Sequence, residues 1–78
     1  MNYKTFDIAL EYDGIQYQGW VTPSDEHHAN GMPRSFHVVL NETMFGNLSK
    51  SGDNWVIDQQ RPAPMVEQVG KLIQSQIK

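Results

Sequence analysis

Three histidines, two of them beside acidic residues, are the side chains in this sequence that could take part in metal chemistry. Asp25, Glu26, His27 and His28 are consecutive, and His37 follows in the next segment. Imidazole and carboxylate groups bind zinc, usually four at a time in a defined geometry. Adjacent histidines tend to diverge, however, and neither His-x-His nor His-x-x-x-His spacing occurs. We therefore expect no metal site and no cofactor, and keep ligand or metal binding by loop 23–33 and its histidines as the alternative function.

Acidic and hydroxyl side chains do not form a catalytic set at the spacing that catalysis needs. Asp7 and Glu11 share one face of an expected strand, where four residues at ~3.3 Å each separate them by about 13 Å. Two cooperating glycosidase carboxylates lie only ~5–9.5 Å apart. Ser35 and His37 share a strand face, but no acid is placed by the sequence to orient the histidine. These patterns predict that the protein is not an enzyme.

Trp20 suggests a binding surface, a hypothesis more informative than the metal or catalytic sites considered above. In the registers described below, Trp20 points away from the expected helix, and Val39 and Met44 share its sheet face. Aromatic residues and methionine are enriched at the centres of protein interfaces. Trp20 could instead pack locally over Gln18 or lie under the long loop. The interface interpretation predicts that a protein partner or a second copy binds Trp20, Val39, Met44 and Gln18.

Residues 9–20 read Ala-Leu-Glu-Tyr-Asp-Gly-Ile-Gln-Tyr-Gln-Gly-Trp. This segment is similar to the opening hairpin of the tRNA pseudouridine synthases, whose pattern is roughly EYDGxxYxGW. The similarity covers 12 of the 78 residues. Those enzymes resemble one another most around a catalytic aspartate in an Arg-Thr-Asp-Ala-Gly motif, which this sequence lacks. No catalytic residue is therefore carried over from the resemblance.

Length and composition restrict the class of protein further. A chain of 78 residues is expected to be a single domain, 1–78, near the lower size limit for folding on one core. It has no cysteine for disulfides or thiolate metal sites. Its net charge is −3 and its basic residues are scattered, so we expect no nucleic acid partner. No apolar run approaches the ~20 residues that span a bilayer, which predicts no membrane partner and a cytoplasmic location.

The first expected element is a β-hairpin over residues 3–22, which turns at Asp13-Gly14. Apolar and polar residues alternate before this turn, as in a half-buried strand. Asp-Gly favours a type I′ turn because both central residues need a positive φ. The resulting register pairs Tyr12 with Ile15, Leu10 with Tyr17, Ile8 with Gly19 and Phe6 with Val21.

The next segments are a long loop, 23–34, and a meander, 35–58. The loop has no periodicity and contains Pro, Gly and Asn, and loops of this length are often functional or mobile. A two-residue turn at Asn41-Glu42 predicts pairing of Val38 with Phe45 and of His37 with Gly46. That register leaves Leu48 facing away from the core, unless a bulge at Gly46 reverses it.

A helix is predicted over residues 64–77, because Pro64 suits a first turn. An apolar stripe then covers an arc of about 140°, formed by Met65, Val66, Val69, Leu72, Ile73 and Ile77. Gly70 lies at the edge of this stripe, which indicates close approach of helix and sheet. We predict an α+β fold: an antiparallel sheet of about five strands, a hairpin plus a meander, with one C-terminal helix on one face. The predicted function is a small non-enzymatic protein-interaction domain that uses the outer sheet face.

Overall fold

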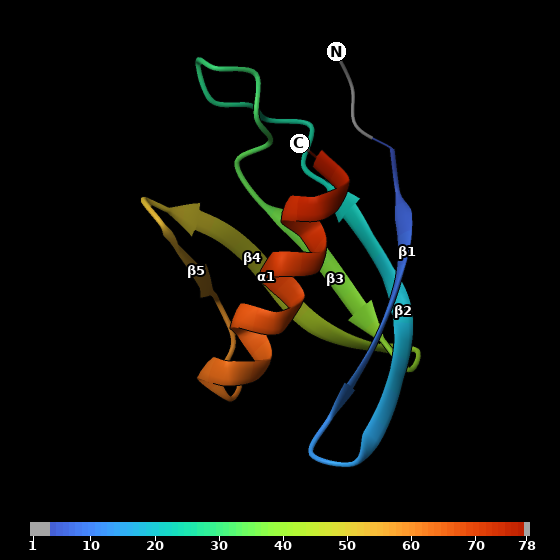
Figure 1. The fold of residues 1–78 in the computed structure, drawn as a ribbon. Coiled ribbons are helices and arrows are strands. Elements are labelled where there is room, and N and C mark those ends of the chain that lie inside the picture. The colour runs from blue at the N-terminus through green and yellow to red at the C-terminus, as the bar shows by residue number, and fades with distance from the viewer. Residues whose placement is uncertain (1–3, 78) are drawn as a thin grey trace.

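One antiparallel sheet and one helix make up the part of the chain described by the computed structural model, residues 4–77 (Figure 1). The elements are β1 (Phe6–Tyr12), β2 (Ile15–Pro23), β3 (Phe36–Leu40), β4 (Thr43–Ser51), β5 (Asn54–Ile57) and α1 (Ala63–Ile77). The strands lie side by side in sequence order, and every neighbouring pair is antiparallel. The predicted α+β fold is therefore confirmed. The start of the expected first hairpin, at residue 3, lies outside the described residues.

Two tight turns set the register of the sheet, as their residue types predict. Asp13 has a φ of 53° and Gly14 a φ of 78°, and Asn41 and Glu42 have φ values of 50° and 63°. Positive φ at both central residues is the geometry of a type I′ hairpin turn. The β1–β2 register confirms all four predicted pairs, and β3–β4 begins with the predicted pair Leu40 and Thr43.

A β-bulge interrupts the β3–β4 pairing. Val39 pairs with Met44, but Val38 pairs with Gly46, so that Phe45 is an extra residue on β4. The predicted pairs of Val38 with Phe45 and of His37 with Gly46 are wrong, because the bulge shifts the register by one residue. The shift returns Leu48 to the core, where its side chain is fully buried. The alternative with a bulge at Gly46 is therefore confirmed, and Gly46 itself has a φ of 147°.

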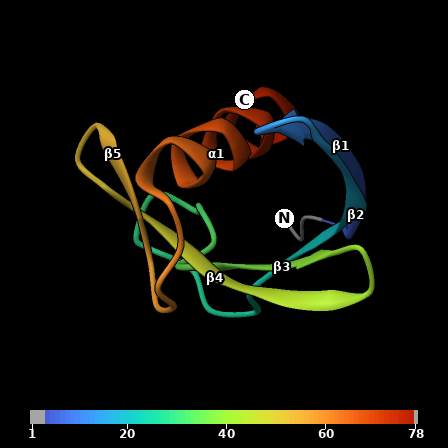
Figure 2. The same ribbon diagram turned by 90° about the horizontal axis from the view of Figure 1, so that it is seen from below.

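The sheet curls strongly, and α1 lies across its open side (Figure 2). The β2–β3 pairing joins the predicted hairpin and meander into one continuous sheet. β2 and β3 approach so closely that a Cβ at Gly19 would lie 1.7 Å from the carbonyl oxygen of Val39. The helix contacts both edge strands, β1 and β5. On the β1 side, the Gln68 side-chain amide donates a hydrogen bond to the Glu11 carbonyl at 2.9 Å.

The core fills the space between the curled sheet and α1. Its buried residues come from all six elements: Ile8, Leu10, Val21, Phe36, Val38, Leu40, Phe45, Leu48, Trp55, Met65, Val66, Val69, Ile73 and Ile77. Leu72, from the predicted apolar stripe of the helix, is partly buried at the margin of the core, as are Phe6 and Tyr17. Within residues 4–77, α1 is too short and too polar to cross a membrane.

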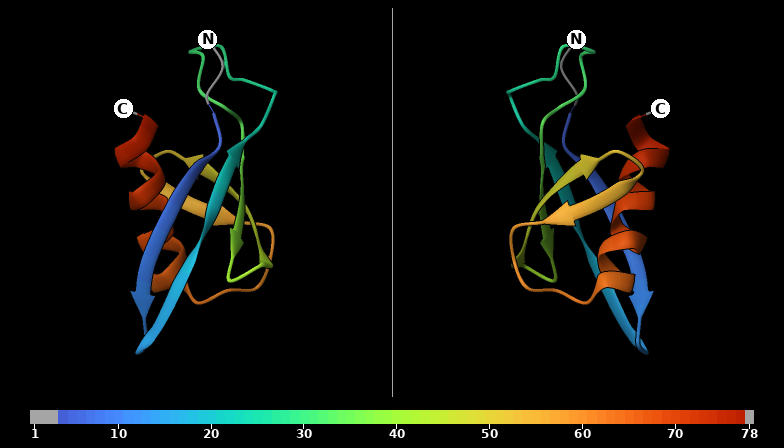
Figure 3. Two further views of the ribbon diagram at one scale, coloured as in Figure 1. Left: turned by 90° about the vertical axis from the view of Figure 1, so that its right-hand side faces the viewer. Right: turned by 90° about the vertical axis from the view of Figure 1, so that its left-hand side faces the viewer.

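The connection between β2 and β3 is a long loop whose two arms are joined by backbone hydrogen bonds (Figure 3). It runs from residue 24 to residue 35, since β2 includes Pro23. Three backbone hydrogen bonds of 2.8–2.9 Å cross it: from Ser24 to Ser35, from Arg34 to Glu26 and from His28 to Met32.

Gly70 tests how closely α1 must approach the sheet. A Cβ at this position would lie 2.3 Å from Cδ1 of Trp55, whose side chain is buried. In an exposed helix, Gly→Ala stabilises by ~1 kcal/mol. Here we expect Gly70→Ala to destabilise by about 1–3 kcal/mol, because displacement of Trp55 outweighs the gain in helix propensity. Urea unfolding followed by circular dichroism measures the change.

The matched control is Gln76→Ala, at an exposed position of the same helix. It should change the free energy of unfolding by no more than about 0.5 kcal/mol. A stabilised Gly70→Ala variant would contradict the close packing of α1 on Trp55.

Candidate functional site

A row of four side chains crosses the outer face of the sheet, opposite to α1. The register places Asp7 beside Trp20, Trp20 beside Val39, and Val39 beside Met44. Because alternate residues of a strand face opposite sides, all four point away from the core that their neighbours form. We call Asp7, Trp20, Val39 and Met44 the Trp20 row. The structure thus brings together the three apolar residues singled out from the sequence.

The two outer residues of the apolar part of the Trp20 row, Trp20 and Met44, are open to solvent. Trp20 is 40% exposed and Met44 is 44% exposed, whereas Val39 between them is half-buried. A side chain exposed to this extent is not enclosed by the segment 24–35. Gln18, two residues before Trp20, is also exposed on this face. Trp20, Val39 and Met44 therefore present a continuous apolar surface across β2, β3 and β4.

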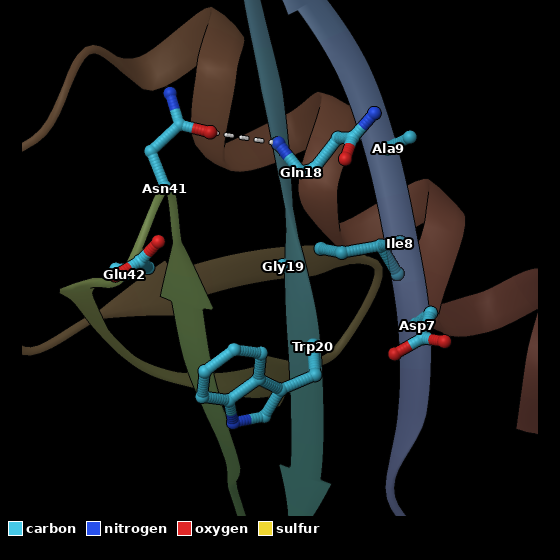
Figure 4. Close-up of a pocket in the computed structure, with 8 residues that line it drawn as sticks. All are labelled: Asp7, Ile8, Ala9, Gln18, Gly19, Trp20, Asn41 and Glu42. Carbon is cyan, nitrogen blue, oxygen red and sulfur yellow. Dashed lines mark hydrogen bonds between the residues drawn. The ribbon is translucent and has the colours of Figure 1, made fainter.

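A hollow of about 600 Å³ adjoins Trp20 on this face (Figure 4). It spans β1, β2 and the β3–β4 turn, and is lined by Asp7, Ile8, Ala9, Gln18, Gly19, Trp20, Asn41 and Glu42. In Figure 4, the carboxylates of Asp7 and Glu42 lie on opposite sides of the hollow, while Trp20 lies at one end. The hollow thus combines one large aromatic side chain with two acidic ones.

Asn41 fixes the position of the β3–β4 turn against β2. Its Oδ1 accepts a hydrogen bond from the Gln18 backbone N–H at 3.0 Å, and its own N–H donates to the Gln18 carbonyl at 2.7 Å. Its Nδ2 also donates to the Gln16 carbonyl at 3.3 Å. These three bonds hold the neighbouring Glu42 at the rim of the hollow. Neither Asn41 nor Glu42 was identified as a site residue from the sequence, where they are recognisable only as a turn.

A second row on the same face is polar and structural. Nδ1 of His37 lies 3.1 Å from Oδ1 of Asn47, and Asn47 donates to Asp58 from its backbone N–H and from Nδ2, at 2.9 Å each. The two Asn47 bonds, that of the backbone first, hold the pKa of Asp58 below its ordinary value, and the charge of His37 acts in the same direction. These contacts link β3, β4 and the end of β5.

The three histidines do not form a common site. His27 pairs with Pro33, and the backbone N–H of His28 donates to Met32 within the segment 24–35, whereas His37 lies on the sheet and contacts Asn47. Within residues 4–77, no three His, Cys, Asp or Glu side chains lie close enough together to hold a metal ion. The arrangement therefore gives no support to the alternative of a histidine metal site.

A second hollow, of about 410 Å³, lies at the end of the sheet beside the β1–β2 turn. Its lining includes Tyr12, Ile15, Tyr17 and Met65. Arg61 borders it and donates hydrogen bonds to the carbonyls of Phe45, Met44 and Gln60 at 2.9, 3.2 and 3.3 Å. Because this guanidinium group already holds three backbone carbonyls, its observed role is to fasten the connection between β5 and α1 onto β4.

Comparison of the chain with protein-family models, with curated proteins and with solved structures finds no significant match. The geometry of the hairpin explains on its own why Asp13 and Gly14 occur in the segment that is similar to the pseudouridine synthases. Both residues adopt the positive φ that the turn requires.

The Asp58 contacts generate a pH dependence of stability. Since the folded-state pKa lies below the ordinary value of 3.8, the ionised carboxylate stabilises the fold above that pH. This stabilisation is lost as the pH falls through the folded-state pKa. We expect Asp58→Ala to lower the free energy of unfolding at neutral pH, and the difference from wild type to shrink in acid. Urea unfolding of both proteins at neutral and at acidic pH measures this difference.

Asp25→Ala, which removes an exposed carboxylate from the segment 24–35, is the control for the general effect of charge removal. If the deficit of Asp58→Ala were the same in acid as at neutral pH, the carboxylate would not be the stabilising group.

Proposed function

We propose that this protein is a non-enzymatic interaction domain that binds another protein chain through the outer face of its sheet, centred on Trp20. The observation that carries the proposal is the apolar part of the Trp20 row, Trp20, Val39 and Met44, which crosses three strands on the face opposite to α1. Exposed apolar residues that are contiguous, rather than scattered singly, are typical of interaction sites.

The Trp20 row is not needed to complete the core. The core residues lie on the other face of the sheet and against α1, where six of them are at most 1% exposed. A tryptophan left outside such a core exposes a large apolar area, and tryptophan is among the residues that contribute most to binding at interface centres. Folding therefore does not account for Trp20, whereas burial against a partner does.

The alternative of a ligand or metal site in loop 23–33 has a smaller hollow, of about 240 Å³, which contains one histidine and no carboxylate and is lined by His28, Asn30, Met32, Pro33, Phe36, Lys50 and Gly52. The histidines of that segment are separated from His37, and the backbone of the segment is used in its own hydrogen bonds. Either of two partners could bind the Trp20 row: a different protein or a second copy of the chain. Light scattering of the purified chain at several concentrations distinguishes them, because only self-association raises the mass with concentration.

The proposal predicts that Trp20→Glu abolishes association without unfolding the chain. A hot-spot residue contributes about 2 kcal/mol or more, so association should weaken at least about thirtyfold. The measurement is photo-crosslinking in cells of the source organism from a benzophenone amino acid at position 18, beside Trp20. The adduct is twice the mass of the chain for a second copy and of another mass for a different partner. Circular dichroism verifies the fold.

Two controls separate the Trp20 row from a general effect of charge or exposure. Val56→Glu places the same charge at a similarly exposed apolar residue on the same sheet face, on β5 and outside the Trp20 row, and should retain the adduct. The crosslinker at Glu67, on the exposed side of α1, should give none. An adduct at position 18 that survives Trp20→Glu, or the absence of any adduct there, would refute the proposed function.

A further inference from the structure

We infer that the hollow beside Trp20 receives an arginine side chain of a partner protein. This inference rests on the proposed function, since it specifies the chemistry of the partner that the same face binds.

The charge of the hollow has one sign. Asp7 and Glu42 contribute carboxylates to it, Gln18 and Asn41 contribute amides, and none of the described residues that line it is a lysine or arginine. Within residues 4–77, neither Asp7 nor Glu42 forms an ion pair with a cation. Two unpaired carboxylates in one depression favour a cationic occupant, because opposite charges give an interface its specificity and speed its formation.

The aromatic wall distinguishes arginine from a simple cation. Trp20 contributes its indole ring to one end of the hollow. A guanidinium group stacks on an indole and binds carboxylates through paired N–H groups, whereas a lysine ammonium group is a compact point charge. An aromatic plane beside carboxylates therefore suits arginine better than lysine.

The hollow is held in shape before anything binds. The three hydrogen bonds of Asn41 fix the β3–β4 turn to β2. The backbone of Glu42 is part of that turn and has the positive φ that a type I′ geometry requires. Binding therefore needs little ordering of the backbone, which removes one of the main costs of association.

A second copy of this chain is a less suitable occupant than a basic partner. It would bring another Asp7 and another Glu42 to the same interface, and like charges that meet in an interface disfavour association. A partner with an arginine at the centre of its contact would instead bring the opposite charge to the hollow that these carboxylates line. The net charge of the chain, −3, also weakly attracts a basic partner.

Titration of the isotope-labelled full chain, followed by amide NMR, tests the inference. The probe is a blocked Gly-Arg-Gly peptide, and its control carries citrulline, which has nearly the shape of arginine but no charge. We expect the arginine peptide to shift the signals of the Trp20 indole N–H and of the Gln18 and Glu42 amides. Its affinity should exceed that of the citrulline peptide about two- to fivefold, the size expected for an exposed cation–π contact.

The double variant Asp7→Asn, Glu42→Gln should reduce this preference, because only the contact with Trp20 then distinguishes the two peptides, and Trp20→Glu should abolish the shifts at Gln18 and Glu42. Equal shifts by both peptides, lost in Trp20→Glu, would overturn the arginine inference and leave the proposed function intact. No shift by either peptide, together with a dimer that Trp20→Glu dissociates, would assign the face to a second copy and also overturn the inference. If neither peptide shifts any signal, the chain is a monomer and position 18 gives no crosslink, the arginine inference and the proposed function are both overturned.

Discussion

The structure depends on one packing constraint: a single helix must fill the concave side of a five-stranded sheet whose two edges it touches. Three close contacts make this possible. β2 and β3 approach at Gly19, the bulge at Gly46 bends β4 and returns Leu48 to the core, and Gly70 lets α1 lie directly on Trp55. A side chain at Gly19 or Gly70 would collide with a neighbouring residue. Because the sheet curls around α1, the apolar residues of this helix pack against the inner face of the sheet.

The outer face is a consequence of this arrangement. Since the inner positions of β2 and β3 are fixed by the core, Trp20 and Val39 have to lie side by side on the other face. The β3–β4 turn then meets β2, where Asn41 binds the backbone of Gln16 and Gln18. The hydrogen bonds that stabilise the sheet therefore also shape the hollow beside Trp20. Fold and candidate site are connected through this turn.

The sequence predicted the features that are determined locally. The turn at Asp13-Gly14 and the alternation of apolar and polar residues around it fix the β1–β2 register. Because side chains alternate between the two faces of each strand, Trp20, Val39 and Met44 lie on one face. The β2–β3 pairing, by contrast, closes a connection of twelve residues, from 24 to 35, which has no periodicity and contains Gly, Pro and Asn. The roles of Asp7 and Glu42 depend on that pairing, because it brings the β3–β4 turn to β2. They could not be predicted from residue types alone.

The central claim is that the Trp20 row contributes to binding and not to folding. It is tested most directly by the free energy of unfolding of the double variant Trp20→Ser, Met44→Ser, measured in urea against wild type. Cross-strand pairs on a sheet surface contribute about 0.2–1 kcal/mol each, so the account predicts a loss of about 1–2 kcal/mol, with an unchanged circular dichroism spectrum. A loss of about 4 kcal/mol or more, the size expected for truncation of buried side chains, would show that the row is part of the core and would contradict the account.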